Sequence, residues 1–324
     1  MKVSVIIPIY KVEAYIERCA RSLSEQTLKD VEYIFVNDCT PDRSVEVLKN
    51  VIEEYPDRKS QIRILHHEIN RGLTTTRNTG LGVATGEFIA HCDSDDWVVP
   101  TMYEMLYQKA VEDEADVVYC DIKMVFRDKD VIARSAQYDK HKFTFVQNYI
   151  ASTWTCLVLV MARKRLYDYY QLKSPNHISY CEDFWLTTRL MHYAAKIAYV
   201  PRAFYNYNCT NDQSIVHTLN KQTEIEEQVA YLETIDFFEK ERVISYYQKQ
   251  MGWRILKSKQ ELILDPDRHK EFMNIYPLSH KYIGNCPYIN TKLKIMMWCL
   301  THHLSWITYA MIYVRNFKEN YIRR

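Results

Sequence analysis

The amino-acid sequence predicts an α/β fold whose central sheet is mostly parallel. Apolar runs of strand length alternate with amphipathic stretches over residues 1–120, and this alternation is typical of successive βαβ units. The composition supports a packed core, because hydrophobic residues make up 47% and charged residues 26% of the 324 residues.

Strands are predicted where β-branched residues cluster, and helices where apolar residues recur every three or four positions. The apolar run 3–9 is typical of a buried parallel strand. Further strands are predicted at 31–36, 62–66, 87–93 and 115–120, and helices at 12–26, 44–55, 74–84 and 98–113. Because ligands bind at the carboxyl ends of strands in such sheets, polar residues directly after these strands are candidate site residues.

The periodic pattern weakens over residues 121–180, where no long element is predicted. The remaining predictions are a helix at 181–195, one or two short strands at 196–208, and helical stretches at 222–264 and 291–322. These patterns divide the chain into an α/β domain at 1–215 and a helical C-terminal region at 216–324.

Charge and cysteine content limit the classes of partner and compartment. The 42 basic and 41 acidic side chains leave a net charge of +1, which argues against a nucleic-acid partner. Nine scattered cysteines without zinc-ligand spacing are typical of a reducing compartment. The N-terminal apolar run is interrupted by Pro8 and Lys11 and lacks a cleavage site, so we interpret it as a strand rather than a signal peptide. A cytoplasmic protein is therefore expected.

Three carboxylates within four residues form the strongest chemical signal. Asp93, Asp95 and Asp96 directly follow an apolar run, and a bound cation would relieve their mutual repulsion. Hard divalent ions such as Mg²⁺ and Mn²⁺ prefer oxygen ligands. A metal site and a solvated acidic turn that caps the helix after Pro100 both agree with this spacing.

Two more polar segments follow predicted strands. Asp38 ends the second strand, where a carboxylate can accept hydrogen bonds from a base or ribose or can form an Asx turn. The segment 70–80 contains Asn70, Gly72 and Arg77. Glycine permits close backbone approach and arginine can bind phosphate, whereas an ordinary glycine turn with a solvated arginine is the alternative.

Glu182 and Asp183 lie in the first turn of the helix predicted at 181–195. A carboxylate at this position can act as a general base, and an acidic first turn also complements the helix dipole. Adjacent side chains point ~100° apart around a helix. Where Asp183 is the base, Glu182 is expected to orient a substrate or to cap the helix.

In chain order, PIYKVEAYI, VNDCTPD, NRGLTTTRNTGLGVATGEFIAHCDSDDW and CEDFW resemble the inverting glycosyltransferases of family 2. The resemblance is close over 1–120 and looser over 150–215, and it ends near residue 220. It implies the GT-A fold for nucleotide-diphospho-sugars, with a nucleotide-sugar-binding half at 1–120 and an acceptor half with the catalytic base at 121–215. Lys11 and Asn37 depart from the family pattern, which has Asn and Asp there.

The resemblance implies a role for each matching residue. Asp183 matches the catalytic base, and Asp95 matches the metal ligand of the family's DxD motif, with Mn²⁺ or Mg²⁺ as the expected cofactor. His217 is a candidate additional metal ligand, with an ordinary surface or hydrogen-bonded histidine as the alternative. The residues expected to bind the nucleotide sugar are Pro8, Ile9, Tyr10, Glu13, Asp38, Asn70, Gly72, Arg77, Asp93 and Ser94.

These matches imply transfer of a hexosyl group, with inversion, from a nucleotide-diphospho-sugar to an acceptor hydroxyl. UDP is the expected nucleotide, and a glycan or lipid-linked acceptor in cell-surface polysaccharide or glycan synthesis is the expected substrate. One alternative is a catalytically silent nucleotide-sugar-binding protein. The intact residues Asp38, Asp95 and Asp183 argue against it. The other is a nucleotidyltransferase, which would carry a Gly-rich, Lys-containing loop that PIYKVEAYI lacks.

The C-terminal stretch 293–314 is apolar and aromatic and has basic residues on both sides. The polar residues 301–303 interrupt it, which argues against a membrane-spanning helix. A helix lying on an anionic membrane surface fits this pattern and would place the protein at the cytoplasmic face of the inner membrane. A helix packed on the catalytic domain or on a partner subunit is the alternative.

Overall fold

The computed structural model describes residues 1–152, 154–212 and 220–322. The chain divides into two compact units, Met1–Glu226 and Glu227–Arg324. Each unit contains a hydrophobic core of its own.

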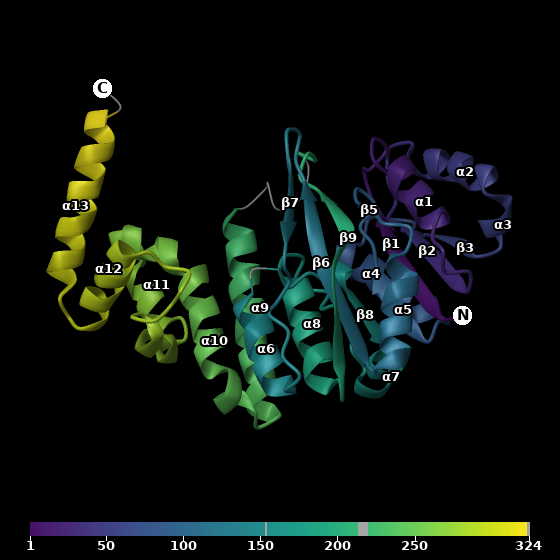
Figure 1. Cartoon of the computed structure of the whole chain (residues 1–324). Coiled ribbons are helices and arrows are strands. Elements are labelled where there is room, and N and C mark those ends of the chain that lie inside the picture. Colours follow the sequence, from purple (N-terminus) through teal and green to yellow (C-terminus); the bar gives the residue numbers. More distant parts are fainter. Residues whose placement is uncertain (153, 213–219, 323–324) are drawn as a thin grey trace. The chain divides into compact units, whose positions relative to one another are not determined.

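The first unit is built on a sheet that has nine strands in the described residues. They are β1 (Val3–Ile9), β2 (Val31–Asn37), β3 (Ile62–His66), β4 (Phe88–His91), β5 (Trp97–Val98), β6 (Val117–Val125), β7 (Asp130–Ala133), β8 (Val160–Arg163) and β9 (Ile197–Asn208). Their order across the sheet is β3-β2-β1-β4-β8-β6-β9-β5, and β7 pairs with β6 (Figure 1).

Strands β1 to β4 pair in parallel, as do β6 and β9, whereas β5, β7 and β8 pair antiparallel with their neighbours. The longest pairings are the parallel ones, which confirms the predicted α/β fold with a mostly parallel sheet. Every residue of β1 is buried, as expected for a parallel strand covered on both faces.

Helices flank this sheet. Those of the first unit are α1 (Ile16–Ser24), α2 (Ser44–Glu54), α3 (Pro56–Lys59), α4 (Leu73–Val83), α5 (Met102–Glu112), α6 (Lys142–Ala151), α7 (Lys164–Tyr170) and α8 (Glu182–Tyr193). Helix α4 packs on β1 and β2. It approaches closely at Gly80, where an added Cβ would lie 2.6 Å from Cγ2 of Ile6.

Within the stretch predicted as largely helical at 98–113, helix α5 begins at Met102, close to the predicted start after Pro100, and Trp97 and Val98 pair with β9 as strand β5. One sequence prediction differs more widely from the structure. Residues 121–180, where no long element is predicted, contain the end of β6 together with β7, α6, β8 and α7. These elements are short, and β7 is largely exposed, so neither strand nor helix periodicity extends far enough to be recognised.

The second unit is helical in its described residues. Its elements are α10 (Ile244–Ser258), η3 (Gln260–Leu264), η4 (Pro266–Arg268), α11 (His269–Asn274), η5 (Pro277–Tyr282), α12 (Thr291–Thr301) and α13 (Ser305–Ile322), and α9 (Lys221–Lys240) crosses the boundary between the units. The single stretch predicted at 291–322 is thus two helices, which separate where His303 has a φ of 62°. Among the described residues, no helix is both long enough and apolar enough to cross a membrane.

Gly86 lies so close to β1 that an added Cβ would be 2.5 Å from the backbone nitrogen of Ser4. We expect Gly86→Ala to lower the free energy of unfolding by ~1–3 kcal/mol, because the strand backbone cannot move aside without disturbing the sheet. Gly82→Ala is the matched control, since its added Cβ meets no described atom within 4 Å. That change lies in helix α4 and is expected to stabilise by up to ~1 kcal/mol. Urea unfolding measures both, and a Gly86→Ala protein as stable as wild type would contradict the close approach.

Candidate active site

The carboxyl ends of β1, β2 and β4 meet at one side of the sheet. The backbone nitrogen of Asp38 donates to the carbonyl of Ile9 at 3.0 Å, and that of Cys92 donates to the carbonyl of Ile6 at 3.1 Å. Pro8 and Ile9 are buried at the end of β1, whereas Tyr10 is 42% exposed. The parallel strands therefore bring together the polar segments that follow the first, second and fourth strands.

Asp38 organises the loop that precedes α4. Its Oδ1 accepts a hydrogen bond from the backbone nitrogen of Arg71, and its Oδ2 accepts one from that of Gly72, both at 2.8 Å. Nδ1 of His67 lies 2.7 Å from Oδ1 as well. Gly72 has a φ of 83°, which favours glycine. The buried carboxylate thus fixes the loop, and Asn70 remains exposed beside it.

Glu13 links the loop after β1 to the start of α2. Its carboxylate accepts hydrogen bonds from the backbone nitrogen and Nε of Arg43, both at 3.0 Å. Lys11, which replaces the usual Asn, has a φ of 54° and donates from its backbone to Oγ1 of Thr40 at 2.8 Å. These contacts shape the loop that carries Tyr10.

The acidic run after β4 does not form one cluster, because each carboxylate has its own partner. Asp93 accepts from Arg77 at 2.8 Å, and Asp95 accepts from Nδ2 of Asn211 at 2.8 Å. Asp96 is buried and accepts from the Tyr205 hydroxyl at 2.8 Å. Ser94 is buried between them. Three chemically identical side chains are thereby given three different environments.

Arg77 is the centre of the site. The side chain is 2% exposed, and its guanidinium binds carboxylates from two other elements. Nη2 donates to Asp93, while Nη1 donates to Oε1 of Glu182 at 2.6 Å and to Oδ1 of Asp183 at 2.9 Å. The structure therefore shows the arginine that was expected to meet a phosphate acting as the countercharge of three carboxylates.

Glu182 and Asp183 differ in exposure although both reach the same nitrogen of Arg77. The Asp183 side chain is 25% exposed and that of Glu182 is 8% exposed. The sequence predicts that Glu182 orients a substrate or caps the helix, whereas the structure pairs its buried carboxylate with Arg77. Glu182 faces the interior, and Asp183 is the carboxylate that solvent can reach.

Burial and the neighbouring Asp183 charge raise the pKa of Glu182 to about 8. Burial also raises the pKa of Asp183, while Arg77 opposes this rise. The raised pKa of Glu182 means that this buried carboxyl group keeps its proton to a higher pH than an ordinary glutamate does.

Three further contacts, which the sequence did not predict, hold Asp183, helix α4 and Asp93 in place. Oδ2 of Asp183 accepts a hydrogen bond from the backbone nitrogen of Leu157 at 3.0 Å. Nδ2 of Asn78 donates to the carbonyl of Ser174 at 2.8 Å, which ties α4 to the segment before α8. Tyr205 is fully buried, and its hydroxyl accepts from the backbone nitrogen of Asp93 at 3.0 Å. Only the side chains of Asn78 and Tyr205 could have been singled out from the sequence.

Asp95 is the residue of this site best suited to a cation. Burial and the charge of Asp93 raise the pKa of Asp95, so a cation would stabilise its anionic form. No group of three or more His, Cys, Asp or Glu side chains suited to a metal occurs among the described residues. The donor set therefore fits a cation that takes one protein carboxylate and completes its oxygen ligands from substrate and water. His217 lies outside the described residues.

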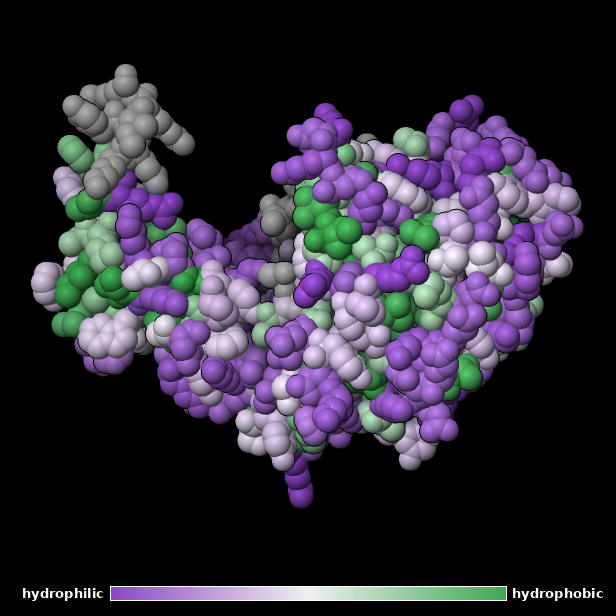
Figure 2. All heavy atoms as spheres, in the orientation of Figure 1, coloured by the Kyte–Doolittle hydropathy of each residue, from purple (hydrophilic) through white to green (hydrophobic). Residues whose placement is uncertain are grey.

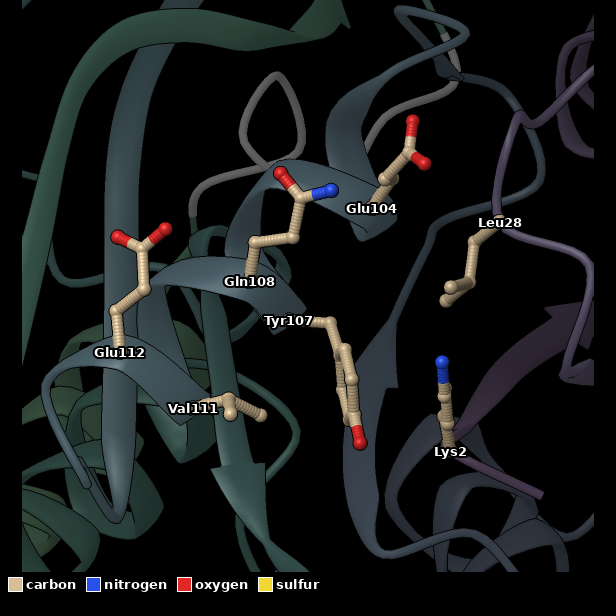
Figure 3. Close-up of a pocket in the computed structure, with 7 residues that line it drawn as sticks. All are labelled: Lys2, Leu28, Glu104, Tyr107, Gln108, Val111 and Glu112. Atoms are coloured by element: carbon tan, nitrogen blue, oxygen red, sulfur yellow. The ribbon is translucent and has the colours of Figure 1, made fainter.

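A separate hollow lies at the other end of β1 (Figure 3). It is lined by Lys2, Leu28, Glu104, Tyr107, Gln108, Val111 and Glu112. It contains no predicted site residue, so the carboxyl ends of the strands remain the candidate active site.

A mostly parallel sheet with carboxylates at its strand ends is the arrangement that the sequence resemblance predicts for a glycosyltransferase. The family model for glycosyl transferase family 2 matches residues 4–186, and the chain belongs to this family.

Relatives and solved structures resemble the chain over different lengths. An uncharacterized glycosyltransferase of Bacillus subtilis, EpsJ, is 32% identical over 63% of this chain, and the match spans 60% of EpsJ. The uncharacterized glycosyltransferase YibD of Escherichia coli is 28% identical over 92% of this chain and 91% of its own length. The structure of Staphylococcus aureus TarS residues 1–349 with UDP-GlcNAc has the same fold, with a TM-score of 0.71 at 17% identity, covering 98% of this chain and 92% of that one.

Glu182 should make the stability of the folded protein depend on pH. Its pKa in the folded state exceeds the ordinary value of 4.5, so the stability that it contributes is complete below the unfolded pKa and is lost as the pH rises through the folded pKa. We expect the melting temperature of the metal-free protein to fall between about pH 5 and about pH 8.5.

Glu182→Gln should flatten this fall, because glutamine keeps a hydrogen-bond acceptor for Arg77 and has no proton to lose. Glu46→Gln, at an exposed position of α2, is the control. Calorimetry with a chelator present compares the three proteins. Equal slopes in wild type and Glu182→Gln would show that Glu182 does not titrate in this range.

Proposed function

We propose that this glycosyltransferase inverts the sugar that it transfers from a nucleotide-diphospho-sugar to an acceptor hydroxyl, with Asp183 as the general base. The observation that carries the proposal is the environment of Asp183. This carboxylate is oriented by Arg77 and by the backbone of Leu157, and it is still partly exposed. A general base needs such a fixed position together with access to the acceptor.

In the proposed step, Asp183 accepts the proton of the acceptor hydroxyl as the hydroxyl oxygen attacks the anomeric carbon of the donor. The new carbon–oxygen bond forms on the face opposite the leaving group. The bond to the diphosphate breaks, and its electron pair departs with the nucleoside diphosphate. A single displacement of this kind inverts the anomeric configuration.

The donor is proposed to bind where β1, β2 and β4 end. Tyr10 and Asn70 are exposed there, and the side chain of Asp93 is 31% exposed, so these residues can contact a nucleotide sugar directly. Asp38 and Glu13 are held by contacts within the chain, and we propose that they shape the donor loops. UDP is the proposed nucleotide, supported by the UDP-GlcNAc bound in the TarS neighbour.

Asp95 is proposed to hold the divalent cation, Mn²⁺ or Mg²⁺. Such a cation would supply positive charge that balances the diphosphate leaving group. Asn211 donates to Oδ2 of Asp95 and so orients the carboxylate. Asp96 is not proposed as a ligand, because Tyr205 and the backbone nitrogen of Asn208 already donate to its oxygens.

The acceptor is proposed to be a glycan or lipid-linked saccharide in cell-surface polysaccharide synthesis, made in the cytoplasm. No disulfide joins any of the nine cysteines in the described residues, and this is consistent with a reducing compartment. The family resemblance supports the substrate class.

Asp183→Asn tests the proposed base. We expect the rate of Mn²⁺-dependent UDP release, measured with the UDP-sugar that wild type hydrolyses fastest, to fall by ~10²-fold or more, because asparagine cannot accept the proton. Donor affinity measured by calorimetry should stay within about twofold, since Asp183 is not proposed to bind the donor.

Glu182→Gln is the matched control, because it changes the neighbouring carboxylate that is buried. We expect it to retain at least about a tenth of the wild-type rate. An inactive Glu182→Gln protein beside an active Asp183→Asn protein would reverse the two roles.

Asp95→Ala tests the proposed cation site. Calorimetric titration with UDP should show tighter binding to wild type when Mn²⁺ is present, and this gain should be lost in Asp95→Ala, because the cation loses its protein ligand. Asp30→Ala, at an exposed position before β2 and so at the opposite end of that strand from the site, should keep the gain. If Asp95→Ala gains as much affinity from Mn²⁺ as wild type, another residue holds the cation.

A further inference from the structure

Helix α13 exposes a continuous row of aromatic side chains. Trp306, Tyr309, Tyr313 and Phe317 are 67%, 45%, 72% and 61% exposed, respectively. They are three, four and four residues apart, so they lie along one face of the helix over about 16 Å. We call these four residues the aromatic stripe.

The opposite face of α13 already packs in the core of the second unit. Thr308 is fully buried, and its hydroxyl donates to the carbonyl of Met296 at 3.0 Å. Ile312 is 5% exposed and belongs to the core that also contains Met297. The aromatic stripe lies on the other face of α13 and stays 45–72% exposed, although the ring of Tyr309 also lies 5.4 Å from that of His269.

Helix α12 adds to the exposed apolar surface. Ile295 is 47% exposed and Trp298 is 49% exposed. Figure 2 shows hydrophobic side chains, in green, at the surface of this end of the chain. Apolar side chains that gather in this way on a protein surface mark a contact with another body.

The charge of the same segment is strongly positive. Residues 291–324 contain six basic residues and one acidic residue, although the whole chain has a net charge of only +1. Lys292 is exposed at the start of α12, and Arg315 is exposed on α13. A second copy of the chain would bring the same positive charge and be repelled, whereas an anionic surface would be attracted.

We propose that the aromatic stripe lies on an anionic lipid surface, with α13 parallel to the membrane. Tryptophan and tyrosine prefer the boundary between lipid headgroups and acyl chains, and basic residues nearby bind anionic headgroups. The stripe would enter this boundary while the packed face of α13 keeps the second unit folded. Only the purpose of this membrane contact rests on the proposed function: it would bring the enzyme to a lipid-linked acceptor.

The test is sedimentation of the full chain with lipid vesicles. We expect binding to vesicles of phosphatidylcholine with one quarter phosphatidylglycerol, little binding to phosphatidylcholine alone, and weaker binding as salt increases. The variant W306A/Y313A should bind the anionic vesicles at least about tenfold more weakly, because it removes the two most exposed stripe residues. Alanine favours the helix, so circular dichroism and the melting temperature should not change.

The matched control is I132A/Y169A, which removes two side chains of the first unit that are 69% and 81% exposed. It should bind vesicles like wild type. Equal vesicle binding by wild type and W306A/Y313A would overturn the proposal, as would failure of wild type to bind anionic vesicles. A dimer in light scattering that W306A/Y313A converts to a monomer, without a change in vesicle binding, would instead assign the stripe to a second copy.

UDP release from a UDP-sugar in vesicle-free buffer separates this proposal from the proposed function. Wild type and W306A/Y313A should release UDP at the same rate, because the stripe belongs to the second unit and the candidate active site is built from the first. A wild-type protein that binds vesicles and releases no UDP would contradict the proposed function and leave the membrane contact supported.

Discussion

The candidate active site depends on one buried positive charge, the guanidinium of Arg77. Arg77 lies on α4 and binds Asp93 after β4 and the Glu182–Asp183 pair at the start of α8, which are 16 and more than 100 residues away in the sequence. Burying a guanidinium is costly, and the carboxylates offset that cost only when all are in place. Loss of the guanidinium would leave three carboxylates without their countercharge. Breaking one buried ion pair in this way lowers the free energy of unfolding by about 3–5 kcal/mol. The contacts of Arg77 therefore hold the carboxylates in position, balance their charge and join α4 to α8.

The surrounding carboxylates show how environment divides the work among identical groups. Asp38 accepts a hydrogen bond from the loop before α4, and Asp96 accepts hydrogen bonds from Tyr205 and Asn208. Glu182 is buried and tends to keep its proton. Asp95 and Asp183 are the two that combine a fixed orientation with the chemistry that a sugar transfer needs, countercharge for the leaving group and a proton acceptor for the nucleophile.

The sequence predicts the parts of this protein that local patterns encode. The parallel strands β1 to β4 are visible as apolar runs, and the motifs that end them could be placed on one side of the sheet. The partners of Arg77 could not be predicted, because periodicity says nothing about contacts between residues 105 positions apart in the chain. The same reason explains why the ion pair between Glu182 and Arg77 was not predicted. The elements of 121–180 were missed because they are short and carry little periodicity of their own, and because β8 pairs with strands that are distant in the sequence.

The most direct test of the central role of Arg77 is a double-mutant cycle with Asp183. If Arg77 acts by positioning the base, Arg77→Lys should lower the rate of UDP release at least about tenfold in wild type and less than about twofold in the Asp183→Asn protein. Circular dichroism must first show that each variant is folded. If Arg77 instead binds the donor itself, the two losses will multiply and Arg77→Lys will raise the KM for the donor in both backgrounds, and that result would contradict a buried guanidinium that acts by holding the base.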